Sequence, residues 1–407
     1  MIKRVFALAS VIALALFLVG PGLAEARGPE VVKTSVEPGF PLQLVFNLSA
    51  KSDVAITDIR LHYVVEEEGY ANVTSEASVE FMPASMVSTR WSMDMKKVGG
   101  LPPGSGVQYW WEVEDINGDK TTTVPARVEF EDRRYPWRNL AERGVTIYWY
   151  EGGESFASEI MLAAQQALTR LAGDTGAYLK KPARIYVYAN TQELQGALIF
   201  PQEWAGGVAF LEFGVIAIGI SPEQLAWGKR AIAHELTHLV IHQMTFNPYG
   251  GLPTWLDEGL AMYAEGTLDS SFVTFLKGAI DSNGLISVRS LSSPFSAFAG
   301  ESYLSYAQSY SLIEFLITRY GRAKMLELLN TFSQGSSYDE ALVKVYGFDR
   351  DGLDAVWRAG ITQSEQEPTA RPEINVPLLA ATSAAAATAC LLLLSLAAER
   401  WAWRRGW

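Results

Sequence analysis

The sequence predicts a chain of three parts: a small all-β sandwich, a larger α+β domain and one C-terminal transmembrane helix. Three observations indicate this order. Alternating apolar and polar residues come first, apolar residues at helical spacing dominate later, and an uncharged apolar run lies near the end. With 407 residues, the chain is long enough for two or three domains with buried cores.

The N-terminus has the three parts of a secretory signal. Lys3 and Arg4 give a positive start, residues 5–20 are apolar, and small residues around Ala24 suit a signal peptidase. An uncleaved anchor is the alternative, but the apolar stretch is short for a membrane span, which needs about 20 residues. We therefore interpret residues 1–26 as a cleaved signal peptide.

Residues 30–133 are expected to form a β-sandwich module. Turn signals such as Pro38-Gly39 and Asn117-Gly118 separate short runs that alternate apolar and polar residues. Strands at this spacing are typical of a sandwich like an immunoglobulin or fibronectin module. No cysteine pair pins the sandwich, so its topology stays open. The runs are 42–46, 59–64, 107–113 and 126–130.

Residues 140–361 are expected to form an α+β domain. A mixed half with strands and a helix comes first, and a mostly helical half follows it. The sequence predicts strands at 145–150 and 183–188, one or two more within 208–220, and helices at 154–171 and 222–244.

The end of the chain predicts a membrane anchor. Residues 362–375, with prolines and charges, indicate an extended linker. Residues 376–398 carry no charge and are numerous enough to cross a bilayer of about 30 Å. Arginines and tryptophans in 399–407 are typical of a cytoplasmic tail. We expect a single-pass protein of the cell membrane that contacts lipid through this helix and carries its folded domains outside the cytoplasm.

Composition excludes some classes of function and narrows the search for a site. The net charge of −12 and the lack of a basic stripe argue against nucleic-acid binding. Cys390 is the only cysteine, so a thiolate zinc cluster is impossible. Of four histidines, His62 lies alone in an expected strand, and the other three fall within nine residues. The chemistry should therefore be sought around these three.

The helix expected at 222–244 contains a His-Glu-x-x-His pattern formed by His234, Glu235 and His238. Residues four apart on an α-helix differ by about 40° in azimuth, so both imidazoles project from one face and can bind one Zn²⁺. Glu235 lies about 100° round the helix, where it can hold a water molecule rather than the metal. A pattern this short can also occur by accident.

A second helix, entered through Pro253, follows with the run Trp-Leu-Asp-Glu258-Gly-Leu-Ala. The His-Glu-x-x-His helix followed by a Trp-Leu-x-Glu-Gly-x-Ala helix resembles the gluzincins, the clan of thermolysin and the aminopeptidase N-like enzymes. Among them, the chain most resembles the peptidase MA-like family over about residues 140–360. This resemblance implies one Zn²⁺ per chain, with Glu258 as third ligand. The metzincin pattern fails, because Ile241 and Met244 occupy its glycine and histidine positions.

Three neighbours of the motif are further candidates for the site. His242 could form a ligand pair with His238, but no glutamate would then follow the first histidine, so we interpret it as a core or supporting residue. Asp257 is expected to hydrogen-bond a ligand or cap a neighbouring group. Glu265, two turns after Glu258, is expected to be solvated.

The predicted reaction is the hydrolysis of a peptide or protein substrate, with Glu235 as general base. Gluzincins commonly take a second oxyanion donor from a downstream Tyr or His, and Tyr306 and Tyr310 are the candidates here, with Tyr306 first. The stretch 206–219 resembles the family's edge strand beside the active site. The Gly-x-Met-Glu-Asn signature of the aminopeptidases is absent there, so endo- and exopeptidase activity both stay open.

Two other functions fit the same residues. A cell-surface binding or adhesion protein could keep zinc as a structural ion, in which case Glu235 would be dispensable. A zinc hydrolase could also act on a substrate that is not a peptide. The sequence does not indicate an oligomeric state.

Overall fold

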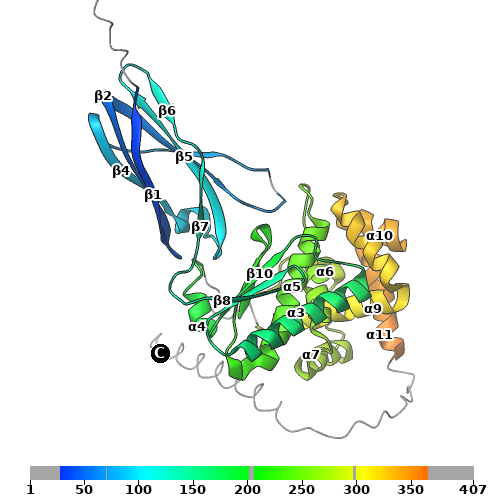
Figure 1. Ribbon diagram of the computed structural model, residues 1–407. Coiled ribbons are helices and arrows are strands. Elements are labelled where there is room, and N and C mark those ends of the chain that lie inside the picture. Colours follow the sequence, from blue (N-terminus) through cyan, green and yellow to red (C-terminus); the bar gives the residue numbers. More distant parts are fainter. Residues whose placement is uncertain (1–27, 70, 201–205, 297–298, 365–407) are drawn as a thin grey trace, which may run out of the picture. The chain divides into compact units, whose positions relative to one another are not determined.

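The computed structural model describes residues 28–69, 71–200, 206–296 and 299–364 (Figure 1). The first described region is β-rich. Its elements are β1 (Glu30–Gly39), β2 (Gln43–Val65), β3 (Ser75–Ser78), β4 (Ala84–Asp94), the short helix α2 (Met95–Val98), β5 (Ser105–Asp115), β6 (Lys120–Thr122) and β7 (Ala126–Phe130).

Strand β2 belongs to two layers of this region. Its first half pairs with β1 and β4, whereas its second half pairs with β3 and β5. Phe46 from the first half, Leu61 from the second and Trp111 of β5 are fully buried in one hydrophobic core. The two halves therefore face each other across that core. The runs expected at 42–46 and 59–64 thus lie in one continuous strand rather than in two.

The second described region begins with a five-stranded sheet in the order β11-β12-β10-β9-β8. Strand β10 is parallel to β9 and β12, and β8 and β11 are antiparallel edge strands. The strands expected at 145–150 and 183–188 are confirmed, and the stretch 208–220 supplies two strands. The bounds are β8 (Arg138–Glu142), β9 (Val145–Trp149), β10 (Ala183–Tyr188), β11 (Gly207–Phe210) and β12 (Val215–Gly219).

Helices α3 (Glu154–Thr175) and α5 (Leu225–Thr245) cover one face of this sheet (Figure 1). Both are confirmed close to the bounds that the apolar spacing predicts. Ile232, Leu236 and Leu239 of α5 are buried in the core with Ile185 of β10. Because Leu236 lies about 200° round the helix from residue 234, burial of this apolar face directs residues 234 and 238 away from the sheet.

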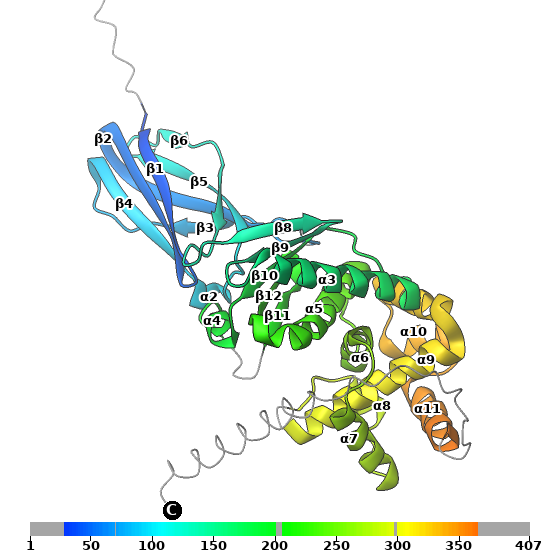
Figure 2. The same cartoon turned by 60° about the horizontal axis from the view of Figure 1, so that its bottom comes forward.

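The helices that follow α5 form the C-terminal part of the domain (Figure 2), and three further short helices, α4, η1 and η2, precede α5. Helix α6 packs against both α5 and α9. Helix α9 is kinked at Gly321, whose φ of 80° breaks the helical backbone. The bounds are α4 (Thr191–Gln195), η1 (Leu211–Phe213), η2 (Pro222–Gln224), α6 (Thr254–Glu265), α7 (Ser270–Asp281), α8 (Val288–Leu291), α9 (Ala299–Ser333), α10 (Tyr338–Tyr346) and α11 (Arg350–Ser364).

The predicted three-part fold is wrong in its third part. The structure has a β-rich N-terminal region and a helical C-terminal domain, and none of its described helices is both long and apolar enough to span a bilayer. Long helices such as α3 are apolar on one face only, and that face packs on the domain's own core. The stretch 376–398, on which the prediction rested, lies outside the described residues, as do the linker, the tail and the proposed signal peptide at 1–26.

Candidate metal centre

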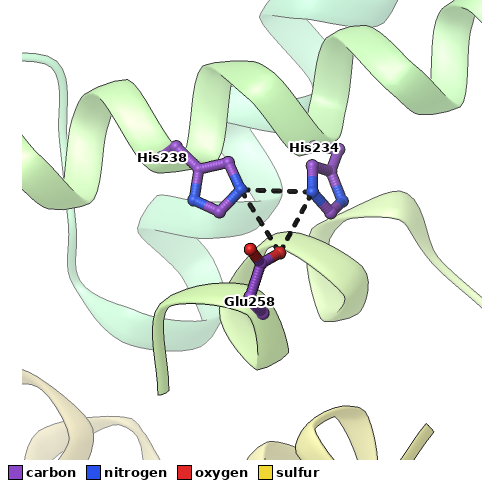
Figure 3. A group of neighbouring side chains, drawn as sticks. All are labelled: His234, His238 and Glu258. Carbon is purple, nitrogen blue, oxygen red and sulfur yellow. Dashed lines mark hydrogen bonds and ion pairs between the residues drawn. The ribbon is translucent and has the colours of Figure 1, made fainter. Parts of the chain in front are cut away.

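Two imidazoles and one carboxylate converge between α5 and α6 (Figure 3). The Nε2 atoms of His234 and His238 are 3.1 Å apart. Glu258 Oε2 lies 3.5 Å from His234 Nε2 and 3.6 Å from His238 Nε2. The three side chains are 13–21% exposed, so the group is largely but not completely shielded from water.

The donor atoms of this group fit a tetrahedral zinc ion. With ligands at about 2.0–2.1 Å, the corners of such a tetrahedron are about 3.3–3.4 Å apart, close to the three measured separations. Glu258 Oε2 is buried and has no hydrogen-bond partner among the described residues. A buried polar atom without a partner is costly, and a bound cation would satisfy it. Two imidazoles and one carboxylate are also a donor set typical of catalytic zinc sites.

Local structure brings the three residues together. The α-helical period places His234 and His238 one turn apart on the face of α5 that the sheet does not cover. Pro253 caps the start of α6 with extended backbone, so the helix begins at Thr254 and Glu258 faces α5 in its second turn. Packing of α6 on α5 then completes the group.

His234 is supported by a carboxylate that the sequence interpretation missed. Its Nδ1 lies 2.9 Å from Glu265 Oε1, and Glu265 Oε2 accepts hydrogen bonds from Arg230 Nη2 at 3.1 Å and Nε at 3.2 Å. Glu265 is only 15% exposed, so the expectation that it is solvated is wrong. The sequence does contain a signal for this contact. Residues seven apart share a helix face, so Glu265 lies on the same face of α6 as Glu258, and this face meets the site.

His238 is supported by Asp257. Its Nδ1 lies 3.1 Å from Asp257 Oδ1, which confirms the expectation that this aspartate hydrogen-bonds a ligand residue. Carboxylates at both Nδ1 atoms fix the ring orientations and leave both Nε2 atoms facing Glu258.

Charge and burial shift the acid–base properties of these groups. Burial lowers the pKa of His234, but the neighbouring carboxylates of Glu258 and Glu265 outweigh it and raise this pKa to about 9. Burial raises the pKa of Glu258, but the two imidazoles outweigh it and hold this pKa well below its usual range. The pKa of Glu235 is raised, mainly by burial. Glu258 is therefore held as an anion, whereas Glu235 is shifted toward taking up a proton.

Glu235 lies against the edge strand β11. A Cβ atom added to Gly207 would lie 3.1 Å from Glu235 Oε1 and 3.2 Å from its Cγ. A side chain at this position would therefore press on the glutamate. The stretch 206–219 indeed contains an edge strand next to the site, as the resemblance implied.

The two candidate tyrosines of α9 have different neighbours. Burial raises the pKa of Tyr306 well above its usual value, and the charges of Glu258 and Glu235 raise it further, so Tyr306 is close enough to the site to be affected by both. Tyr310 instead packs on Tyr263, with ring centroids 5.7 Å apart, and its pKa is raised to about 12 by burial and by Glu314. Tyr306, not Tyr310, is therefore the tyrosine on which the charges of Glu258 and Glu235 act.

His242 does not join the group. Its ring packs on Phe246 with centroids 5.5 Å apart. Its buried Nε2 has no hydrogen-bond partner in the described part of the chain. Burial lowers the pKa of His242, which favours the neutral ring of a core residue.

Known proteins resemble this chain in part. No curated protein matches it. Catalytically inactive OgpA from Akkermansia muciniphila, solved in complex with an O-glycopeptide substrate, is 12% identical over 26% of this chain and 30% of that chain, with a TM-score of 0.20. Aminopeptidase A from Legionella pneumophila, solved in complex with aspartic acid, is 11% identical over 81% of this chain and 49% of that chain, with a TM-score of 0.34.

These solved structures are considerably longer than the part that matches, since the alignments span about a third and about half of their chains. With TM-scores this low, we base no conclusion on them. The family comparison is specific. The model of the Peptidase MA superfamily matches residues 163–363, which include His234, Glu235, His238 and Glu258. Through this domain, the chain belongs to the Peptidase MA superfamily.

Proposed function

We propose that this protein is a zinc-dependent peptidase with its active site between α5 and α6. The observation that carries the proposal is the convergence of His234 Nε2, His238 Nε2 and Glu258 Oε2, with separations of 3.1–3.6 Å. These three residues would hold the ion. When bound, zinc supplies Lewis acidity that favours ionisation of a water molecule and polarises a substrate carbonyl.

Glu235 is the residue that moves protons in this proposal. Its carboxylate accepts a proton from the attacking water while the water oxygen bonds to the peptide carbonyl carbon. It then gives that proton to the amide nitrogen as the carbon–nitrogen bond breaks, so the products are a carboxylic acid and an amine. The pKa of Glu235, which burial raises, supports this role. A raised pKa means a higher proton affinity, which a carboxylate needs if it is to take up a proton and pass it on.

The substrate would bind as an extended strand beside β11. In an antiparallel ladder, alternate residues direct their backbone groups toward the partner strand. Gly206 O accepts from Gly219 N at 3.0 Å, and Val208 is opposite Ala217, so the backbone groups of Gly207 and Ala209 point away from β12. These groups can pair with a peptide backbone regardless of its side chains.

Metal analysis combined with a peptide-library digest tests the proposal. The wild-type protein should contain one zinc per chain and cleave peptides, whereas Glu235→Gln should keep the zinc and lose at least about a hundredfold in kcat. Glu314→Gln is a control, because Glu314 is a glutamate of α9 outside the metal group and its pKa is also raised by burial. A Glu235→Gln protein that cleaves normally would remove Glu235 from the mechanism. Zinc without cleavage of any peptide would favour a different substrate.

The two tyrosines test the second oxyanion donor as a matched pair. Tyr306→Phe should lower kcat about 100-fold with little change in zinc content, because one donor to the oxyanion is lost. Tyr310→Phe should change kcat by less than about threefold, since Tyr310 packs on Tyr263. Equal losses in the two variants would remove Tyr306 from the mechanism.

A further inference from the structure

Trp227 shares the helix face that carries the metal group. It lies seven residues before His234 on α5, so its side chain projects about 20° from the direction of residue 234 and about 20° from that of residue 238. The ring nevertheless stays 45% exposed. A half-exposed indole on the reactive face of a helix is a large apolar surface that the domain's own core does not use.

The backbone at the start of strand β11 lies against both this ring and Glu235. A Cβ atom added to Gly206 would lie 2.5 Å from Cη2 and 2.7 Å from Cζ2 of Trp227. The next residue, Gly207, meets the side chain of Glu235 in the same way. Two consecutive glycines therefore contact first the tip of the indole and then Glu235. The absence of side chains there lets the ring lie directly against the strand.

We propose that Trp227 forms a substrate-binding subsite for an aromatic or large aliphatic side chain. An extended peptide beside β11 advances at about the same 3.3 Å per residue as β11 itself. The side chain that meets the indole would therefore lie within about two residues of the bond that is cleaved. This inference rests on the proposed peptidase function and adds a substrate preference to it.

The chemistry of the ring decides which side chain fits. The indole offers an apolar face and edge, which favour offset or edge-to-face contact with another ring and burial of aliphatic carbon. A glycine at the same substrate position would leave the ring in water. A cationic side chain would be favoured only if its contact with the π face outweighed the loss of its hydration.

Peptide binding by the full-length Glu235→Gln protein tests the subsite without turnover. Fluorescent peptides carrying Phe, Gly or Arg at each position near the cleaved bond are compared by anisotropy. At one position, Phe should bind about tenfold more tightly than Gly. Adding Trp227→Ala should abolish that ratio, and Trp227→Phe should restore most of it. Phe275→Ala is the matched control, since Phe275 is a 43% exposed aromatic residue of α7 outside the metal group, and it should leave the ratio unchanged.

Several outcomes would overturn the subsite. They are the absence of binding by every peptide, a Phe preference that survives Trp227→Ala, the absence of a Phe preference at any position, and a stronger preference for Arg. Failure of the peptidase function itself is recognised separately, because the wild-type protein would then cleave no member of the library.

Discussion

His234 and His238 are both histidines on one face of α5, but the carboxylates at their Nδ1 atoms have different surroundings. Glu265, behind His234, is 15% exposed and accepts two hydrogen bonds from Arg230. Asp257, behind His238, is 35% exposed, and the described residues give it no cationic partner besides His238. One imidazole is therefore supported by a fixed ion pair and the other by a carboxylate that water can reach.

This difference shows how much a supporting carboxylate depends on its own surroundings. A buried carboxylate held by a guanidinium has few alternative positions, so its hydrogen bond to the ring costs little further ordering. An exposed carboxylate divides its hydrogen bonds between the ring and water, and salt screens its charge. We therefore expect His234 to be the more rigidly oriented of the two ligands, and four measurements can test this expectation.

The largest effect is expected for Glu265→Gln. The amide removes the charge at His234 Nδ1 and takes from Arg230 the nearer of its two carboxylate partners, leaving Asp269 at 3.9 Å, so zinc affinity should fall about 10–100-fold. Competition with a chromogenic chelator measures the affinity. A change of less than about threefold would contradict the importance given to the buried carboxylate.

A smaller loss, of about tenfold or less, is expected for Asp257→Asn. The exposed aspartate contributes less to ring orientation, and water can replace part of its contact. The same chelator assay applies, and the d–d spectrum of the cobalt-substituted protein reports whether the Glu258 contact is kept. A loss larger than that of Glu265→Gln would reverse the comparison.

Arg230→Met should lower zinc affinity about three- to tenfold without removing a group that touches an imidazole. Glu265 would keep its charge but lose the two hydrogen bonds that fix Oε2. Arg230→Lys should recover part of the loss, because an ammonium keeps the charge but not the two-point geometry. Arg289→Met is a control of similar exposure on α8, where it pairs with Asp351, and it should leave the affinity unchanged.

The smallest effect is a difference in salt dependence. Raising the salt concentration from about 0.05 to 1 M screens exposed charges far more than buried ones. The affinity ratio between wild type and Asp257→Asn should therefore shrink by about twofold, whereas the ratio for Glu265→Gln should stay nearly constant. Parallel chelator titrations in the two buffers measure both ratios, and equal shrinkage would show that the two carboxylates are equally accessible.

Local rules were enough for the elements that carry the metal group. His234 and His238 share a face because an α-helix repeats every 3.6 residues, and Pro253 marks the start of α6 because proline suits a helix entry. Strands β9 and β10 followed from apolar runs of strand length. These features depend on a few neighbouring residues, so a single sequence determines them.

Contacts between elements required the tertiary structure. Glu265 reaches His234 only because α6 packs on α5, and the charge of Glu258 acts on Tyr306 rather than on Tyr310 because α9 packs on α6. The half-exposed Trp227 likewise depends on where β11 runs. Helical periodicity gives the face on which a residue lies but not the element that this face meets, because that choice is made by packing between residues far apart in the chain.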